Sequence, residues 1–371
     1  MRILHCLRAP VGGLFRHVLD LASEQAARGH DVGILADSNA ADRLTGPKFA
    51  AIEPAMKLGI SRIAMGRQPG LGDFRAYRSV LQHARQRNLD VLHGHGAKGG
   101  AYARLAARSL KKEGQSARAF YTPHGGSLNF EPGTFEGRLF ARIEGLLERQ
   151  TDGLIFESAY AARVYRERIS VAGAPERVIP NGLQPEDFAD FAPDPKATDF
   201  LFIGELRPIK GVEYLLTALA ALNAQRRVTA TIVGSGPNAA ELQQKSVALG
   251  LAPVVTFTGA LPAREALKLG RIMVVPSLAE SFPYVVLEAA AAGLPLISTC
   301  VGGIPEIVAG TDTALIPPGD AEALGTAMRA ALDHPGAAWA RATRLRENVS
   351  SKFTVAGMAT AVLDFYALTI G

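Results

Sequence analysis

Two carboxylates, Glu280 and Glu288, interrupt a largely apolar segment that runs from Pro276 to Gly293. A carboxylate in apolar surroundings is costly unless a cation, a hydroxyl or an amide satisfies it. Pro283 is typical of the first turn of a helix, and Gly293 is typical of a helix end. We therefore expect Glu288 in mid-helix and Glu280 in the loop before it, and both indicate a ligand site rather than solvated surface.

Two cations, Arg207 and Lys210, stand in the segment from Gly204 to Gly211, between an expected strand and an expected helix. Ligands of open α/β sheets bind at the carboxyl ends of the strands. Two cations beside a helix N-terminus can hold a diphosphate and neutralise a leaving group without a metal. The alternative is that both side chains are simply solvated in a loop.

Three glycine-rich turns each follow an expected strand and precede an expected helix, where backbone N–H groups can bind anions. Gly12 and Gly13 form either a site for a diphosphate or sugar, or a plain tight turn. Gly234 and Gly236 could hold the nucleoside end of a ligand. The segment 94–99 matches G-x-G-x-x-G, but we assign no dinucleotide site there. That site belongs in the first βα unit, with an acidic residue about 20 positions onward.

His124 follows an expected strand in a turn that contains Pro123, Gly125 and Gly126. Functional residues concentrate on such loops, although a structural or solvated histidine is an equal alternative. The acidic residues show no H-E-x-x-H, D-x-D or comparable ligand set, so we expect no required metal. The chain has 2 cysteines, far apart and without metal-ligand spacing, which argues against a disulfide framework.

The composition is that of a globular protein of two domains, with 371 residues, 48% hydrophobic and 20% charged. The first residues lack the apolar segment and cleavage site of a signal peptide, so we expect no export. No uncharged apolar run reaches the ~20 residues that a membrane-spanning helix needs. We therefore expect a cytoplasmic protein.

Basic residues are concentrated between residues 57 and 118, where 13 Lys and Arg face 3 Asp and Glu, although the whole chain is only +5. This stretch is either a solvated helix surface or a surface that attracts an anionic partner. Phospholipid headgroups and a phosphorylated acceptor fit the second alternative. Nucleic acid is not expected, because no recognition module or row of aromatic residues accompanies the charge.

Short strand-like runs alternate with longer helical patterns, which is typical of parallel sheets built from βαβ units. The pattern occurs twice, and a Pro- and Gly-rich linker places the boundary near 182–198. A last helix is expected from Val355 to Leu368. The expected strands are 2–7, 31–36, 90–93, 118–122, 153–156, 199–203, 228–233, 254–257, 272–275, 295–298 and 314–316. The expected helices are 14–28, 74–87, 100–111, 135–149, 158–168, 211–225, 238–248, 263–269, 283–292, 304–309 and 321–333.

In combination, these motifs resemble glycosyltransferase family 4, the retaining nucleotide-sugar transferases of the GT-B fold. The resemblance covers nearly the whole chain. It rests on the Gly12-Gly13 turn, the Arg207-x-x-Lys210 loop and the Glu280-to-Glu288 pair, which is similar to the E-x7-E signature of the family. Further landmarks lie at Leu21-Ala22, Gly29 to Val32, Asn181-Gly182 and Gly302 to Glu306.

The resemblance implies an α/β fold with two Rossmann-like domains that face a central cleft. Residues 1–182 would bind the acceptor and residues 183–352 the donor, and the last helix, 353–371, would pack back on the first domain. Arg207 and Lys210 would bind the donor diphosphate and Glu288 the ribose. Glu280, with the backbone amides of Phe282, Pro283 and Tyr284, would contact the sugar, and Ser281 would belong to the same donor site. His124 would contact the sugar near the reacting centre. Ser281 replaces the usual Gly of the family, and this change bears on which sugar fits. Leu269 to Arg271 stands where an Ala-Asp is frequent, and neither departure touches Arg207 or Lys210.

The implied activity is retaining transfer of a sugar from a UDP- or GDP-sugar to an acceptor hydroxyl, without a required metal. Cell-surface polysaccharide, lipopolysaccharide and glycolipid are the expected products. The expected partners are the nucleotide sugar, a glycan or lipid-linked acceptor and an anionic membrane surface, on which the enzyme would be peripheral. The alternatives are a nucleotide-sugar epimerase or hydrolase of the same fold, a nucleotide-sugar-binding protein without catalysis, or a membrane-surface interaction module.

Overall fold

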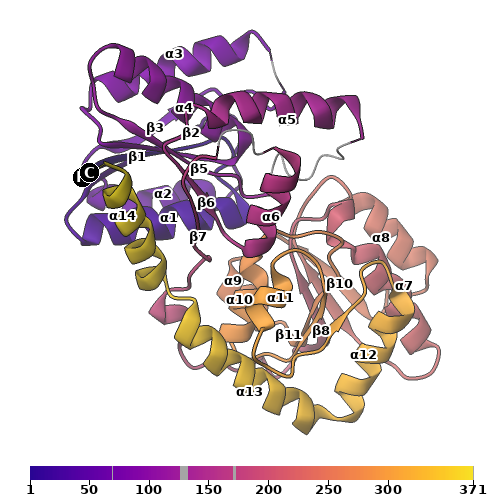
Figure 1. Cartoon of the computed structure of the whole chain (residues 1–371). Coiled ribbons are helices and arrows are strands. Elements are labelled where there is room, and N and C mark those ends of the chain that lie inside the picture. Colours follow the sequence, from indigo (N-terminus) through magenta and orange to yellow (C-terminus); the bar gives the residue numbers. More distant parts are fainter. Residues whose placement is uncertain (69, 126–132, 170–172, 371) are drawn as a thin grey trace. The chain divides into compact units, whose positions relative to one another are not determined.

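The computed structural model describes residues 1–68, 70–125, 133–169 and 173–370 (Figure 1). Its contacts divide the chain into two compact units. Unit 1 is Met1–Gly182 together with Val355–Gly371, and unit 2 is Leu183–Thr354. Gly126 lies outside the described residues.

Unit 1 is built around a seven-stranded parallel sheet in the order β3-β2-β1-β4-β5-β6-β7. The strands are β1 (Arg2–Leu7), β2 (Asp31–Asp37), β3 (Gly59–Ile63), β4 (Val91–His95), β5 (Arg118–Thr122), β6 (Gly153–Phe156) and β7 (Glu176–Val178). The helices are α1 (Gly12–Ala27), α2 (Thr45–Ile52), α3 (Gly72–Arg85), α4 (Gly96–Lys112), α5 (Phe135–Glu148), α6 (Ala159–Arg168) and α14 (Val355–Ile370).

Alternation along β1 separates the two faces of this sheet, because successive side chains of a strand point to opposite sides. Leu4 and Cys6 belong to the core that contains the buried residues of α3 and α4. Ile3 packs on the opposite face with α14, and Leu7 packs there with α1. His5, between them, therefore points to the α1 and α14 face, and its side chain is buried. Figure 1 shows α14, in yellow, beside α1.

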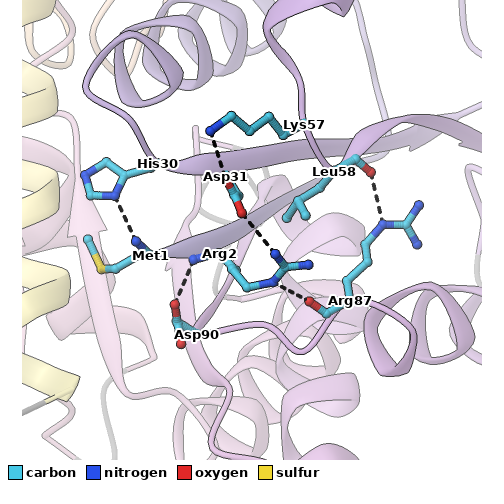
Figure 2. A network of polar contacts seen from close by, with 8 residues as sticks. All are labelled: Met1, Arg2, His30, Asp31, Lys57, Leu58, Arg87 and Asp90. Carbon is cyan, nitrogen blue, oxygen red and sulfur yellow. Dashed lines mark hydrogen bonds and ion pairs between the residues drawn. The ribbon is translucent and has the colours of Figure 1, made fainter.

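The start of β1 is fixed by charged groups from three neighbouring segments (Figure 2). The Arg2 backbone N–H donates to Asp90 Oδ2 at 2.7 Å, and the Arg2 guanidinium donates to Asp31 Oδ2 at 2.9 Å and to the Arg87 carbonyl at 2.7 Å. Lys57 Nζ lies 3.2 Å from Asp31 Oδ1. The Arg87 guanidinium donates to the Leu58 carbonyl at 3.1 Å, so two cations of the basic stretch, Lys57 and Arg87, belong to this polar network.

The glycines of segment 94–99 have a packing explanation. A Cβ on Gly94 would lie 2.5 Å from Gly100 Cα, and one on Gly99 would lie 2.4 Å from the Cys6 carbonyl oxygen. A Cβ on Gly100 would meet the Tyr121 ring at 2.2 Å. These glycines let α4 lie directly against β1, β4 and β5, which accounts for the motif without a nucleotide.

Unit 2 repeats the architecture with a six-stranded parallel sheet in the order β10-β9-β8-β11-β12-β13. The strands are β8 (Thr198–Ile203), β9 (Ala230–Val233), β10 (Val255–Gly259), β11 (Gly270–Val275), β12 (Leu296–Thr299) and β13 (Leu315–Ile316). The helices are α7 (Val212–Asn223), α8 (Ala239–Ala248), α9 (Ala263–Leu267), α10 (Tyr284–Ala291), α11 (Ile304–Val308), α12 (Ala321–Asp333) and α13 (Pro335–Lys352). The two Rossmann-like sheets expected from the sequence are confirmed.

The structure adds elements that the sequence patterns did not predict, namely α2, β3, β7 and α13. It also corrects the start of α10. Pro283 is the N-cap residue, with an extended backbone at φ −75° and ψ 123°, and the helix begins at Tyr284. Within the described residues, no helix is both long and apolar enough to cross a membrane.

Candidate functional site

The loops at the carboxyl ends of β8 and β11 join Lys210 to Glu280. Lys210 Nζ donates to Glu280 Oε1 at 2.6 Å, and the Ser277 hydroxyl donates to the same oxygen at 2.7 Å. The Glu280 side chain is 9% exposed and that of Lys210 is 24% exposed. An ammonium has three donors. Lys210 can therefore keep its bond to Glu280 and still donate to a phosphate.

The backbone at Glu280 is fixed by a close approach of Gly302. Gly302 has φ +59°, and a Cβ there would lie 1.8 Å from the Glu280 carbonyl oxygen. The adjacent Gly303 N–H donates to the Ser281 carbonyl at 2.7 Å. The Gly302-Gly303 landmark thus positions the loop that carries Glu280 and Ser281.

Gly234 and Gly236 support the segment that leads to Arg207. A Cβ on Gly234 would lie 1.8 Å from the Gly204 carbonyl oxygen, and one on Gly236 would lie 2.4 Å from that of Leu206. The Leu206 N–H donates to the Ser235 carbonyl at 2.9 Å. This close packing explains why residues 234 and 236 are glycines, and their contact with a nucleoside stays a prediction.

Arg207 precedes the short 3₁₀ turn Pro208–Lys210, and Lys210 is its last residue. The Arg207 side chain is 46% exposed, and its Nη1 lies 3.5 Å from Glu205 Oε2, which is a weak surface contact. Lys210 is the more strongly held of the two cations. The structure therefore provides one oriented cation beside Glu280 and a second, exposed one on the same loop.

Residues 281–284 have unequal roles in unit 2. Phe282 is 4% exposed and belongs to the core, where its ring meets that of Phe353 edge-on, with centroids 5.4 Å apart. Tyr284 is also buried in this core. Pro283 has no backbone N–H and cannot donate one to a sugar, which corrects the expectation that its amide does so. Ser281 is partly exposed, whereas Phe282, Pro283 and Tyr284 are buried.

Glu288 lies within α10 and is 9% exposed. Its neighbours along the helix, Leu287 and Ala289, are fully buried. In unit 1, Gly12 and Gly13 form the exposed start of α1, and Gly12 has φ +64°. The donor-binding role of these three residues stays a prediction.

His124 lies in the turn that follows β5 and has a left-handed backbone, φ +53°, which is uncommon for a residue with a side chain. Both ring nitrogens have protein partners. Nε2 lies 3.0 Å from His95 Nδ1, and Nδ1 is paired with the Glu157 carboxylate. The side chains of His124 and Glu157 are each 5% exposed. His124 is therefore part of a cluster of buried side chains, which the sequence pattern around it does not predict.

The cluster lies on the side of the sheet that is covered by helices α1 and α14. His5 Nδ1 lies 3.0 Å from His95 Nε2, and His5 Nε2 lies 2.8 Å from Gln25 Oε1. His93 Nε2 lies 2.9 Å from the Thr122 hydroxyl, and its Nδ1 lies 2.6 Å from the Tyr366 hydroxyl. His17 Nδ1 lies 2.8 Å from Asn181 Oδ1.

Burial keeps these imidazoles neutral, because a charge loses hydration there. It lowers the pKa of His5 to about 4 and that of His17 to about 3, where nearby His124 adds to the effect. It also holds the pKa values of His93 and His95 well below their usual range. Burial raises the pKa of Tyr366 as well.

Two groups in the cluster have nitrogens close enough together for a metal, with the ligand atoms within 4.8 Å of one another. They are His5 with His93 and His95, and His17 with His95 and His124. The ring nitrogens of the first group all have hydrogen-bond partners. In the second, His17 Nε2 alone finds no hydrogen-bond partner within the part of the chain that the structure describes. Hydrogen bonds join most of these nitrogens, and the expectation of no required metal stays a prediction.

Sequence reasoning missed His5, His17, His93, His95 and Glu157. A signal for two of them was present, because His93 and His95 are two positions apart and share one face of a strand. The register pairs His5 with His93, but pairing of β1 with β4 is not evident from the sequence.

The basic stretch is partly neutralised within unit 1. Six of its cations form ion pairs, and one of them, the Arg104–Glu144 pair, is fully buried. The others are Lys57–Asp31, Arg85–Glu113, Lys98–Asp73, Lys111–Asp152 and Arg118–Asp152. The stretch therefore does not present its whole charge to a partner.

A cavity of about 370 Å³ lies in unit 2 beside α9 and contains none of the predicted site residues. It is lined by Asp190, Phe191, Ala192, Arg264, Glu265 and Lys268.

This chain is similar to known proteins in sequence and in fold. The profile of "Glycosyltransferase Family 4" matches residues 11–187, and that of "Glycosyl transferases group 1" matches residues 197–334. The glycogen synthase of Mycobacterium tuberculosis (strain CDC 1551 / Oshkosh) is 30% identical over 384 residues, covering 96% of this chain and 91% of that protein.

Two solved structures show the same architecture. Sucrose-phosphate synthase from Thermosynechococcus elongatus has a TM-score of 0.80 and 21% identity, covering 99% of each chain. Anabaena HepE in complex with UDP has a TM-score of 0.78 and 20% identity, covering 99% of this chain and all of that one. The chain is thus a member of the family 4 and group 1 glycosyltransferases, with their GT-B fold.

Proposed function

We propose that this glycosyltransferase moves a sugar, with retention of configuration, from a UDP- or GDP-sugar to an acceptor hydroxyl. The observation that carries the proposal is the Lys210–Glu280 pair at 2.6 Å, at the carboxyl ends of β8 and β11. One side chain supplies a cation for the diphosphate, and the other supplies an acceptor for sugar hydroxyls. The complexes of Anabaena HepE with UDP and with UDP-glucose support a nucleotide-sugar donor.

The reaction breaks the bond between the sugar's anomeric carbon and the β-phosphate oxygen and forms a bond from that carbon to the acceptor oxygen. The electron pair stays on the leaving phosphate, which also takes up the acceptor's proton. Preorganised cations stabilise the charge that develops on that oxygen. In the proposal Lys210 and Arg207 do this without a required metal, and Glu288 binds the ribose.

The donor is tested with a panel of UDP- and GDP-sugars, by measuring nucleoside diphosphate release with and without glycan and glycolipid acceptors. Acceptor-dependent release, with retained anomeric configuration in the product by NMR and full activity in EDTA, is expected. Equal donor loss without acceptor would instead indicate a hydrolase or epimerase. Donor binding by calorimetry with no product in any mixture would indicate a binding protein.

Lys210→Ala tests the role proposed for the Lys210 cation. We expect kcat/KM to fall about 100-fold or more, as for loss of a group that stabilises developing charge. The matched control is Lys196→Ala, an exposed lysine of the same unit, which should keep wild-type turnover. Full turnover of Lys210→Ala with unchanged donor affinity contradicts the proposal.

For the acceptor, we propose a lipid-linked or otherwise anionic glycan of cell-surface polysaccharide, lipopolysaccharide or glycolipid, used at an anionic membrane surface. Exposed apolar side chains on α5 recur at helical spacing, namely Phe135, Leu139, Ile143 and Leu146. Exposed arginines alternate with them at 138, 142 and 149. An apolar stripe with flanking cations fits the interface of an anionic bilayer. This helix supports the proposal better than the paired cations of the basic stretch.

A further inference from the structure

His124 is one member of an unbroken row of hydrogen-bonded side chains inside unit 1. Gln25 Oε1 lies 2.8 Å from His5 Nε2, and His5 Nδ1 lies 3.0 Å from His95 Nε2. His95 Nδ1 lies 3.0 Å from His124 Nε2, and the other nitrogen of His124 is paired with Glu157. Each contact needs one hydrogen, so the protonation of every ring depends on that of its neighbour.

The hydrogens can be assigned from the buried end. A carbonyl oxygen only accepts, so His5 Nε2 donates to Gln25. Burial lowers the pKa of His5 to about 4, so its ring is neutral near pH 7 and its Nδ1 must accept. His95 Nε2 is then the donor to His5.

The same reasoning continues to the loop. Burial holds the pKa of His95 well below the usual range, so its ring is neutral and its Nδ1 accepts from His124 Nε2. The carboxylate of Glu157 also only accepts, so His124 Nδ1 must donate to it. His124 therefore needs a proton on each nitrogen.

We propose that His124 is held as an imidazolium, paired with the Glu157 carboxylate, and that His95, His5 and Gln25 are positioning residues that fix this state. A buried ion pair is stable only when hydrogen bonds satisfy its remaining donors, and His95 satisfies the second N–H of His124. His124 then acts as an oriented cation on the β5 loop and not as a general base. The activity test of this proposal rests on the proposed transfer reaction, whereas its spectroscopic test does not.

The other titratable groups around His124 do not compete for this proton. His17, from α1, packs edge-on against the His124 ring with centroids 4.8 Å apart and bonds to Asn181. His93, from β4, bonds to Thr122 and to Tyr366 of α14. Burial lowers the pKa values of both imidazoles. Glu157, which follows β6, supplies the negative charge that balances His124.

Ring ¹⁵N chemical shifts of histidine-labelled full-length protein test the assignment, since the chain has 8 histidines. His124 is identified from the signals lost in His124→Asn. At pH 7.5 we expect both His124 nitrogens to be protonated, with His5 and His95 neutral and protonated on Nε2. A neutral His124, with His5 and His95 protonated on Nδ1, corresponds to the flipped Gln25 amide and overturns the proposal. Stoichiometric zinc in the purified protein, with histidine shifts that change on its removal, also overturns it.

Glu157→Gln removes the balancing charge while keeping the size of the side chain. We expect His124 to lose its second ring proton at pH 7.5 and kcat to fall about tenfold, with donor KM unchanged. The deficit should shrink as the pH is lowered, because acid restores the imidazolium. Glu113→Gln, in an exposed ion pair of unit 1, is the matched control.

The results separate the two proposals. If His124 is doubly protonated but the protein transfers no sugar, the proposed His124–Glu157 ion pair is supported and the proposed function is contradicted. If Glu157→Gln transfers sugar at the wild-type rate over the same pH range and His124 is still doubly protonated, the proposal that Glu157 holds His124 as an imidazolium is contradicted. Glu157→Asp, which keeps the charge, should recover more activity than Glu157→Gln.

Discussion

Glu280 and Glu288 lie in different structural surroundings, one in a loop and the other in a helix. Glu280 is held in a loop by Lys210 and Ser277, both on the same carboxylate oxygen, Oε1. Its other oxygen is therefore better placed to accept from a sugar. Glu288 lies about one turn after Tyr284, the first residue of the buried helix α10. The two carboxylates should contribute to different steps.

Conservative amides test this difference at single residues. Glu280→Gln should lower kcat about tenfold or more, because it also releases Lys210, while donor Kd changes little. Glu288→Gln should instead weaken donor binding about tenfold, because a ribose hydroxyl loses a charged acceptor. Calorimetry and initial rates on both variants check this, with exposed Glu265→Gln as control. Identical effects of the two substitutions would contradict the division of roles.

The residue types of the proposed sugar site can be predicted from the sequence, but the contacts among these residues cannot. Arg207, Lys210 and Glu280 were singled out by position alone, and the structure joins Lys210 to Glu280, 70 positions apart. His124 was singled out without His95 or Glu157. Contacts of this kind depend on the order of strands in the sheet, and β1 and β4 are neighbours only after the fold has formed.

At the scale of elements, the sequence predicted those that bury a clear apolar face. The elements it missed are short, marginal or alanine-rich. No residue of β3 is fully buried, and β7 is a three-residue strand at the sheet edge. The helix α13 buries Ala338, Ala342, Leu345 and Val349, and the two alanines give only a weak hydrophobic signal. Such elements are stabilised by the tertiary contacts around them more than by their own pattern.

The helix α5 carries a stripe of apolar side chains that is exposed and not buried in the core. Its stripe leaves Phe135 81% and Leu146 59% exposed. Burying a side chain of this size in a bilayer interface contributes about 1.5–3 kcal/mol, and each nearby arginine about 1 kcal/mol on anionic lipid. The wild-type protein should therefore sediment with vesicles that contain phosphatidylglycerol, more at low salt than at high salt.

The double variant Leu139→Ser with Ile143→Ser should reduce that binding about tenfold or more, without change in transfer to a water-soluble acceptor. Val247→Ser, which alters a 64% exposed side chain on α8, is the control and should bind as wild type. Equal sedimentation of the double variant and the wild type, or no sedimentation of either at low salt, would contradict a role for α5.

At the scale of the whole molecule, the two units share an architecture but differ in their buried chemistry. Each has its own parallel sheet and hydrophobic core. Seven of the 8 histidines belong to unit 1, and unit 2 has only His334, which is exposed. The single tryptophan, Trp339, lies in unit 2. Acid should therefore act on the two units differently.

Unit 1 should lose stability as the pH falls below about 6.5, the usual histidine pKa. The folded-state pKa is lowered to about 4 for His5 and about 3 for His17, so the unfolded chain binds more protons across this window. Stability then rises with pH, and each such imidazole contributes a slope of about 1.4 kcal/mol per pH unit. Between pH 7.5 and 5.5, the protection factors for hydrogen exchange, which correct for the intrinsic pH dependence of exchange, should fall far more in β1 and β4 than in β8.

Trp339 fluorescence gives an internal control, since the urea midpoint of unit 2 should change little over the same range. His5→Asn should lower the pH slope of unit 1 by about one proton, even though it also removes a hydrogen bond, because slope and absolute stability are separate measurements. His334→Gln should leave the slopes of both units unchanged. An acid response of equal size in the two units would mean that the buried imidazoles of unit 1 do not control it.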